Sequence, residues 1–264
     1  MATIIHTEDL AVSFDGTTTV FEGLNVAIEK GEFVTLVGVS GAGKSTLLRV
    51  VADLIPASKG TVNVDVPKDP TRRPYAMVFQ AANLMPWRKV GDNITLGLEG
   101  LEVSEQVKQE RIDWTLKLVG LDGYADRWPY QLSGGQRQRI GIARALAVDP
   151  DILLMDEPFG ALDAITRTGL QDELLRIWKE TQKSVLFVTH DIEEAVYLGD
   201  RVLLLGDKPG RIVEEYPVDI DRGTRRVSET FAQKVEEVRN GLQKAIEAAG
   251  ANYSVDEHMN TAEK

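Results

Sequence analysis

The sequence of 264 residues contains no cysteine. This absence excludes disulfide bonds, thiolate nucleophiles and zinc or iron–sulfur sites that are built on cysteine. Histidine is scarce as well, because the chain has three, His6, His190 and His258, and they lie far apart in the sequence. We therefore expect no metal site that is rich in histidine.

Long apolar runs are also absent. No stretch approaches the ~18 consecutive apolar residues of a membrane-spanning helix, and runs such as Ile152–Met155 have the length of a strand. The first residues lack the basic region of a secretory signal. We therefore expect any role at a membrane to depend on a partner.

Basic residues are fewer than acidic ones, with 30 Lys and Arg against 41 Asp and Glu, which gives a net charge of −11. A chain of this kind is a poor candidate for binding nucleic acid by neutralising phosphates. One local basic cluster, Arg137, Arg139 and Arg144, does not fall on a single helix face. We therefore predict no nucleic-acid partner and assign this cluster to a solvated helix or an interface.

Strand-like runs and helical patterns alternate along the chain, with a helical stretch over residues 92–148 between them. The predicted strands are Thr3–Ile5, Leu10–Phe14, Leu24–Ile28, Phe33–Val37, Thr61–Val64, Ala76–Phe79, Ile152–Met155, Val185–Thr189, Val202–Leu205 and Arg211–Val213. The predicted helices are Thr46–Ala52, one carrying Val107 to Val119, Ser133–Ala147, Leu170–Thr181 and a last one carrying Val227, Phe231, Val235, Val238, Leu242 and Ile246; residues from about Gly250 are expected to fray. The alternation predicts an α/β fold with a parallel sheet and a helical subdomain.

A glycine-rich motif follows the apolar run Phe33–Val37. Its residues are Gly38, Val39, Ser40, Gly41, Ala42, Gly43, Lys44, Ser45 and Thr46, which fit the P-loop pattern G-x-x-x-x-G-K-[ST] between a strand and a helix. Backbone N–H groups in such a loop converge on an anion, and the helix N-terminus adds partial positive charge. We expect Lys44 to reach the β- and γ-phosphates of a nucleotide and the Ser45 hydroxyl to face Mg²⁺.

Two carboxylates end the apolar run Ile152–Met155. Asp156 and Glu157 would lie at the carboxyl edge of the sheet, where open α/β sheets bind ligands. Asp156 is suited to hold a water bound to Mg²⁺. Glu157 is suited to polarise an attacking water.

A second anion site is predicted where Ser133, Gly134, Gly135 and Gln136 follow Leu132. Ser133 is suited to cap the helix that begins there, and the two glycines expose backbone N–H groups. One nucleotide does not need two such sites on one subunit. We therefore predict that this site serves the ATP of a second subunit.

Together these motifs resemble the nucleotide-binding subunit of ATP-binding-cassette (ABC) transporters over about residues 3–215. The resemblance implies a P-loop NTPase (RecA-like) core, an N-terminal antiparallel β subdomain and an inserted helical subdomain at about 81–148. The periodicity of the last predicted helix adds a C-terminal helical tail over 216–264. The resemblance also implies that Phe14 stacks on adenine, that Gln80 touches Mg²⁺ and relays to a membrane partner, that Asp163 lies at a dimer interface and that His190 contacts the γ-phosphate. Phe14 departs from the commoner Tyr or Trp, and residues 64–74 lack the usual Asp-Gly turn.

Four further segments narrow the resemblance to importers of the nitrate, sulfonate and taurine group, whose relatives carry thiamine-precursor pyrimidines. These segments are 84–88, 159–163, 170–174 and 189–195. The resemblance implies an ATPase that uses ATP and Mg²⁺, pairs head to tail with a second copy, binds integral membrane permease subunits at the cytoplasmic face of the inner membrane and serves a periplasmic solute-binding protein. A soluble ABC ATPase and a regulatory adaptor that does not hydrolyse ATP remain alternatives.

An apolar cluster lies directly after Gln80, in a segment without a strong helix or strand pattern. It contains Leu84, Met85, Pro86 and Trp87. Such a cluster in a loop indicates that something packs on it. Two interpretations stay open: a helix of the permease docks there, or Trp87 and Leu84 fill a local core.

Overall fold

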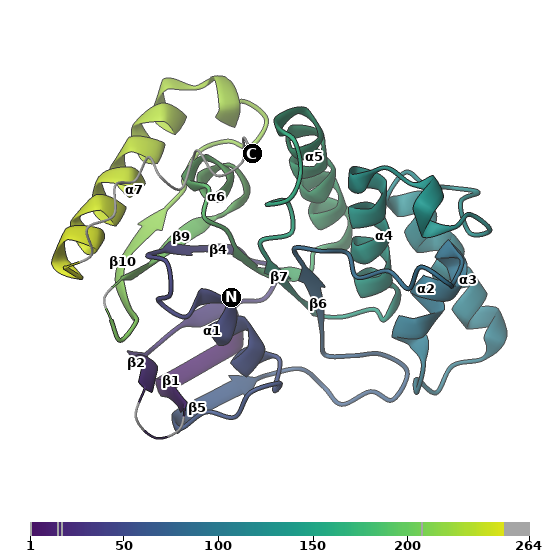
Figure 1. Cartoon of the computed structure of the whole chain (residues 1–264), viewed down its shortest axis with the longest axis horizontal. Coiled ribbons are helices and arrows are strands. Elements are labelled where there is room, and N and C mark those ends of the chain that lie inside the picture. Colours follow the sequence, from purple (N-terminus) through teal and green to yellow (C-terminus); the bar gives the residue numbers. More distant parts are fainter. Residues whose placement is uncertain (1, 15, 17, 207, 251–264) are drawn as a thin grey trace. The chain divides into compact units, whose positions relative to one another are not determined.

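The computed structural model describes residues 2–14, 16, 18–206 and 208–250 (Figure 1). The contacts divide the chain into two compact units. Unit one contains the described residues up to Asp65 and from Ser184 onward, and unit two contains Val66–Lys183. Within the described ranges, no helix has both the length and the apolar content that crossing a bilayer requires.

The first sheet of unit one is antiparallel and is built around the long strand β1 (Thr3–Phe14). Its partners are β2 (Thr18–Leu24), β3 (Ala27–Glu29) and β5 (Lys59–Val64). The predicted break between Thr3–Ile5 and Leu10–Phe14 is wrong, as is the single strand Leu24–Ile28. Thr7 is the reason for the first error, because this polar residue is fully buried and its hydroxyl bonds the Leu24 oxygen and the Val26 amide.

The second sheet of unit one is mainly parallel. In it, β4 (Phe33–Gly38) lies between β8 (Ser184–Val188) and β9 (Arg201–Gly206), and β10 (Arg211–Pro217) pairs antiparallel with β9. The residues of β4 and β8 are buried almost throughout, as expected for parallel strands covered on both faces. This burial explains why the sequence predicts both strands so closely.

Among the described residues of unit one, three helices and one 3₁₀ turn accompany the two sheets. They are α1 (Lys44–Val51), α6 (Ile192–Leu198), the 3₁₀ turn η2 (Arg225–Val227) and α7 (Glu229–Ala248). Helix α6 packs on β4 and β9, and α7 packs on α6, β9 and β10 (Figure 1). Val227 was predicted on the apolar face of the last helix, but it precedes α7 and is 88% exposed. The predicted fraying beyond Gly250 falls on residues 251–264, outside the described residues.

Unit two pairs β6 (Tyr75–Phe79) in parallel with β7 (Ile152–Asp156) and adds helices. The helices are α2 (Val90–Leu98), α3 (Glu105–Leu118), α4 (Gly134–Ala147) and α5 (Ala164–Thr181), with the 3₁₀ turn η1 (Pro129–Gln131) before α4. Helix α4 is central, because it packs on α2, α3, α5 and β6. The α/β class, the parallel strands and the helical segment are therefore confirmed, although α5 begins at Ala164 rather than at Leu170.

Candidate nucleotide-binding site

The P-loop in unit one is fixed by close backbone packing. A Cβ atom at Gly38 would lie 2.0 Å from the Leu205 oxygen. A residue without a side chain is therefore required where β4 passes the end of β9. Gly43 has a φ of 97°, which favours glycine, and a Cβ atom there would lie 2.7 Å from Cγ1 of Val20. The glycines thus hold the loop tightly against the strands around it.

Lys44 lies across this loop. Its Nζ donates to the carbonyl oxygens of Gly38 at 2.8 Å and of Val39 at 3.2 Å. Lys44 is also the first residue of α1, whose first turn contains no acidic residue. The ammonium group and the helix N-terminus therefore place positive charge at one loop, which suits a phosphate.

His190 follows the strand next to the P-loop strand. In the parallel pair β4 and β8, Leu36 is aligned with Val188, and the Thr189 amide donates to the Leu36 oxygen at 3.2 Å. Gly38 and His190 each lie two residues beyond the aligned pair. His190 is exposed. The P-loop and His190 therefore both follow the carboxyl ends of neighbouring parallel strands, at the same edge of the sheet.

Phe14 is the last residue of β1 in the same unit. Its side chain is 45% exposed, and its backbone is paired with Thr18 of β2. A large aromatic side chain that is left half in solvent at a strand end is available for stacking. This exposure fits the role that the resemblance implies for Phe14.

In unit two, Gln80, Asp156 and Glu157 lie at the carboxyl edge of β6 and β7. Phe79 is aligned with Asp156, so Gln80 and Glu157 are the next residues of the two strands. Glu157 has a φ of 46°, which is uncommon outside glycine and is often found at functional sites. A Cβ atom at Gly160 would lie 2.9 Å from Nε2 of Gln80, so the turn after Glu157 returns to Gln80.

The second predicted anion site, residues 132–136, which we call the signature segment, forms the start of α4. Ser133 is the N-cap, its Oγ accepts from the Gln136 amide at 3.2 Å, and Oε1 of Gln136 accepts from the Ser133 amide at 2.9 Å. This capping box holds both side chains at the helix start. Ser133 and Gly134 are exposed, which leaves the helix N-terminus open to an anion.

The segment that begins α5 lies beside this helix start. A Cβ atom at Gly135 would lie 2.6 Å from Cγ2 of Thr166, so the glycine permits the close approach. Asp163 is the N-cap of α5, and its carboxylate accepts from the Thr166 amide at 3.0 Å. Hydrogen bonds from Thr166 hold the pKa of Asp163 below its usual value. Unit two therefore brings Asp163 and the signature segment together.

A groove of about 500 Å³ lies in unit two. It is lined by the first turns of α4, by residues just before α5 and by the segment after Gln80. Residues that line it and that the sequence did not single out are Pro129, Tyr130 and Gln138. Trp87 is 70% exposed, so the interpretation that it fills a local core is wrong. Gln138 could not be found from its own helix, because its Nε2 donates to the Phe79 oxygen, 59 residues away.

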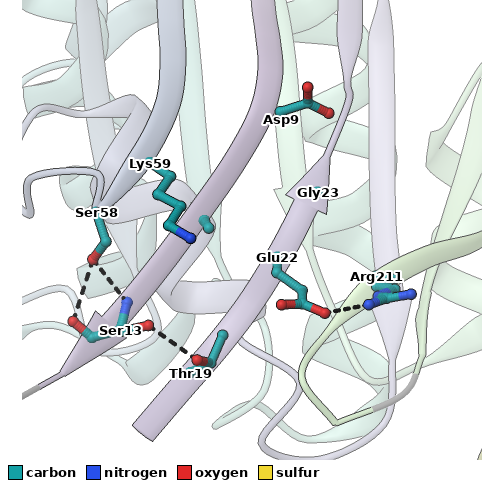
Figure 2. Close-up of a pocket in the computed structure, with 9 residues that line it drawn as sticks. Asp9, Ser13, Thr19, Glu22, Gly23, Ser58, Lys59 and Arg211 are labelled. Atoms are coloured by element: carbon teal, nitrogen blue, oxygen red, sulfur yellow. Dashed lines mark hydrogen bonds and ion pairs between the residues drawn. The ribbon is translucent and has the colours of Figure 1, made fainter. Parts of the chain in front are cut away.

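Two other features carry none of the predicted nucleotide chemistry. Arg137, Arg139 and Arg144 donate to backbone carbonyl oxygens of unit two, which favours a structural role over nucleic-acid binding. A hollow of about 480 Å³ lies in unit one. Its lining includes the ion pair of Glu22 and Arg211 (Figure 2). Its lining contains none of the residues that the sequence predicts for the nucleotide site.

The predicted residues thus form two sets, each described within its own unit. Unit one contains Phe14, the P-loop and His190. Unit two contains Gln80, Asp156, Glu157, the signature segment and Asp163.

Comparisons with known proteins show the family of this chain. The family model described as ABC transporter matches residues 21–160. The taurine import ATP-binding protein TauB of Rhizobium johnstonii is 44% identical over 240 residues, which cover 87% of this chain and 91% of that protein. The dimeric structure of MJ0796, a bacterial ABC transporter cassette, is 32% identical with a TM-score of 0.69, covering 82% of this chain and 100% of that one. A structure of MJ0796 in a post-hydrolysis state with ADP and Pi is 31% identical with a TM-score of 0.66 and the same coverage. The chain therefore belongs to the ABC transporter family, as one of its ATP-binding subunits.

Proposed function

We propose that this chain powers the uptake of a small solute, of the taurine, sulfonate or nitrate type, through a separate membrane permease. Its reaction is the ATP hydrolysis of the family to which it belongs. The relative from Rhizobium johnstonii is named for taurine import and is similar to this chain over most of both lengths. That similarity supports import, and it supports a solute of this class.

The observation that carries the proposal is the sheet edge in unit one that bears both the P-loop and His190. The loop concentrates N–H groups and the Lys44 ammonium, and the aligned strand presents His190 beside it. A phosphate bound on the loop would meet a second polar group from the neighbouring strand. This is the arrangement that phosphoryl transfer requires, since positioning and electrostatics dominate its catalysis.

In the proposed reaction, a water oxygen attacks the γ-phosphorus of ATP, the bond from that phosphorus to the bridging oxygen breaks, and ADP leaves. We assign Glu157 to orient the water and to accept its proton. Lys44 offsets charge on the β- and γ-phosphates, and His190 contacts the γ-phosphate. Phe14 stacks on the adenine ring.

Ser45, Gln80 and Asp156 are the proposed Mg²⁺ residues. Their hydroxyl, amide and carboxylate oxygens are hard donors of the kind that Mg²⁺ prefers, and the ion usually takes its remaining ligands from waters and phosphates. The described residues contain no cluster of three or more His, Cys, Asp or Glu suited to a metal. When bound, Mg²⁺ would neutralise phosphate charge.

We propose that two copies of the chain pair head to tail, so that Ser133–Gln136 and Asp163 of one copy complete the nucleotide site of the other. The exposed helix start at Ser133 supports this pairing, as does the dimeric state of the similar cassette. Ile165, which is exposed beside Asp163 at the start of α5, is a further residue for the contact.

The groove in unit two is the proposed docking site for the permease at the cytoplasmic face of the membrane. The groove is lined by Gln80, by residues of the segment 81–86 and by α4. A permease helix docked there would contact Gln80 and would therefore respond when nucleotide binds. A periplasmic binding protein would deliver the solute. We favour this function over a soluble ABC ATPase or a non-hydrolysing adaptor, because the similar protein is named for import and Glu157 and His190 are both present.

Lys44→Ala should weaken ATP binding by roughly 10- to 100-fold, because it removes a charged contact to phosphate. Isothermal titration with ATP measures the change. Arg49→Ala is the matched control, since Arg49 is a cation near the other end of α1 and is exposed. Unchanged ATP affinity in the Lys44→Ala chain would count against the assigned phosphate site.

Trp87→Ala should leave the isolated chain folded and its basal ATPase measurable, yet uncouple hydrolysis from uptake in the assembled transporter. The reason is that Trp87 is exposed and directly follows the segment 81–86 that we assign to the permease. Uptake per ATP hydrolysed in proteoliposomes measures coupling, and Trp114→Ala, an exposed tryptophan on α3, is the control. Full coupling in Trp87→Ala, together with no cross-link from Leu84→Cys to a cysteine in the permease loop, would refute the docking site.

Transport itself is tested with the chain, its permease and its binding protein in proteoliposomes. Labelled taurine and labelled nitrate are offered with ATP inside the vesicles, and Glu157→Gln serves as the inactive control. We expect ATP-dependent uptake of at least one of the two. Uptake of neither solute by an assembly that hydrolyses ATP would overturn the proposed solute class.

A further inference from the structure

Arg225 is a buried arginine in the turn η2, between β10 and α7. Its side chain is 2% exposed, and a buried charge is costly unless it is well hydrogen-bonded. One part of the guanidinium binds the chain that follows β10. Nη2 donates to the Val218 oxygen at 3.3 Å, and Nε and Nη2 donate to the Ile220 oxygen at 3.1 and 2.8 Å.

The other part of Arg225 binds the C-terminal end of α6. Nη1 donates to the carbonyl oxygens of Val196, Tyr197 and Gly199 at 3.1, 2.9 and 2.9 Å. The last carbonyls of a helix lack partners within the helix, and positive charge is favourable there. Burial lowers the pKa of Arg225 to about 10, so the side chain remains charged at neutral pH. Arg225 is therefore a side-chain cap for α6.

The opposite end of α6 begins beside His190. Asp191 is the N-cap, and its carboxylate accepts from the Glu194 amide at 3.0 Å. The Asp191 amide in turn donates to Oγ1 of Thr189 at 3.0 Å. Helix α6 has seven residues and is about 10 Å long. A movement of its C-terminal end would therefore be felt at His190.

The same C-terminal segment holds α6 through two further contacts. The guanidinium carbon of Arg226 lies 3.7 Å from the centroid of the Tyr197 ring, which is a cation–π distance. Helix α7 packs along α6 (Figure 1) and buries Val235 and Val238. Arg225 and Arg226 therefore hold the half of α6 that is remote from His190, and α7 packs on the same helix.

We propose that residues 218–228, which we call the α6 clamp, hold α6 in the place from which His190 reaches the γ-phosphate, with Arg225 as the positioning residue. The inference rests on the role proposed above for His190. It gives residues 218–228 a part in ATP hydrolysis through α6, without assigning any of them to contact with the nucleotide. A displacement of about 1 Å at a reacting group costs up to roughly 100-fold in rate, so a small loosening of α6 is enough to matter.

The first test is the Arg225→Met variant of the full chain. Its kcat for ATP hydrolysis should be roughly 10- to 100-fold lower than that of the wild-type chain. Its ATP affinity should stay within about twofold of the wild-type value, because the P-loop is untouched. The control is Arg239→Met, since Arg239 is an arginine of α7 that lies outside the clamp and binds the Glu236 carboxylate at 2.8 Å. The control should keep its kcat within about twofold at a temperature where both variants are folded by circular dichroism.

The second test asks whether Arg225 acts through His190. If it does, the double variant His190→Ala with Arg225→Met should be no slower than His190→Ala alone, because effects of residues that act as a unit do not add. Losses that multiply in the double variant would overturn the clamp. So would a folded Arg225→Met chain with the wild-type kcat.

Arg225→Lys decides the matter if Arg225→Met does not fold. Lysine keeps the positive charge but lacks the planar guanidinium group, which donates to several carbonyl oxygens at once. We therefore expect kcat to fall at least about threefold in a folded chain. A wild-type kcat in that variant would overturn the clamp. The His190→Ala variant separates the two proposals, because its hydrolysis at the wild-type rate would reject the role of His190 itself.

Discussion

Glu157→Gln should lower the rate of ATP hydrolysis by ~10²–10⁴-fold, the usual scale for the loss of a general base, while ATP binding is retained. Glutamine keeps the shape of the side chain but cannot accept the proton of the attacking water. Glu157 directly follows Asp156 at the end of β7, and its left-handed backbone sets the turn that returns to Gln80. Phosphate release by the purified chain measures the loss.

The control for this variant is Glu102→Gln, which removes an exposed carboxylate from the same unit. It should hydrolyse ATP at the wild-type rate. ATP affinity, measured by fluorescence titration, should be similar in all three chains. Turnover near the wild-type rate in a pure Glu157→Gln preparation would remove Glu157 from the mechanism.

Ser133→Arg should abolish the dimer that Glu157→Gln forms with ATP. In the Glu157→Gln background, ATP is bound but not consumed, so we expect light scattering to report a dimer. The wild-type chain without nucleotide should be largely monomeric. An arginine at the exposed N-cap of α4 would add bulk and charge where the partner's nucleotide must approach, so the dimer should be lost.

Ser104→Arg is the matched control, because Ser104 is also an exposed N-cap serine and its Oγ accepts from the Val107 amide in α3. The loss of a helix cap costs about 1 kcal/mol at either site. Only the Ser133 variant should therefore affect dimerisation. A dimer that persists with Ser133→Arg would mean that the signature segment lies outside the interface.

The sequence predicts best where function depends on local pattern. The P-loop, the capped helix at Ser133 and the two carboxylates at the end of β7 were all found from short motifs, because each needs a strand or helix end at a fixed spacing. Buried parallel strands such as β4 and β8 were found from continuous apolar runs. These elements position most of the candidate site.

The sequence predicts poorly where distant groups satisfy a polar residue. Thr7 interrupts the apolar pattern of β1, yet it is buried because its hydroxyl bonds the chain around Leu24. Arg225 looks like a surface residue in a basic segment, yet it binds carbonyls up to 29 residues away. Such partners are visible only once the fold is known.

The helix starts show the same limit. Asp163 was placed at a dimer interface by resemblance, but its structural role as the N-cap of α5 was missed, so that helix was predicted to begin at Leu170. The residues between Asp163 and Leu170 are largely exposed and therefore lack an apolar period. Capping, rather than burial, sets where α5 begins.

The central claim is that one ATP site is built from two copies of this chain, and a mixing experiment tests it most directly. Lys44→Ala disrupts the P-loop, and Ser133→Arg disrupts the signature segment. Each variant alone should therefore be inactive in ATP hydrolysis. A mixed pair contains one site with the intact loop of the Ser133→Arg chain and the intact signature of the Lys44→Ala chain. We predict that phosphate release by the mixture clearly exceeds the sum of the two variants measured alone. A mixture that equals that sum would contradict a site shared between two copies.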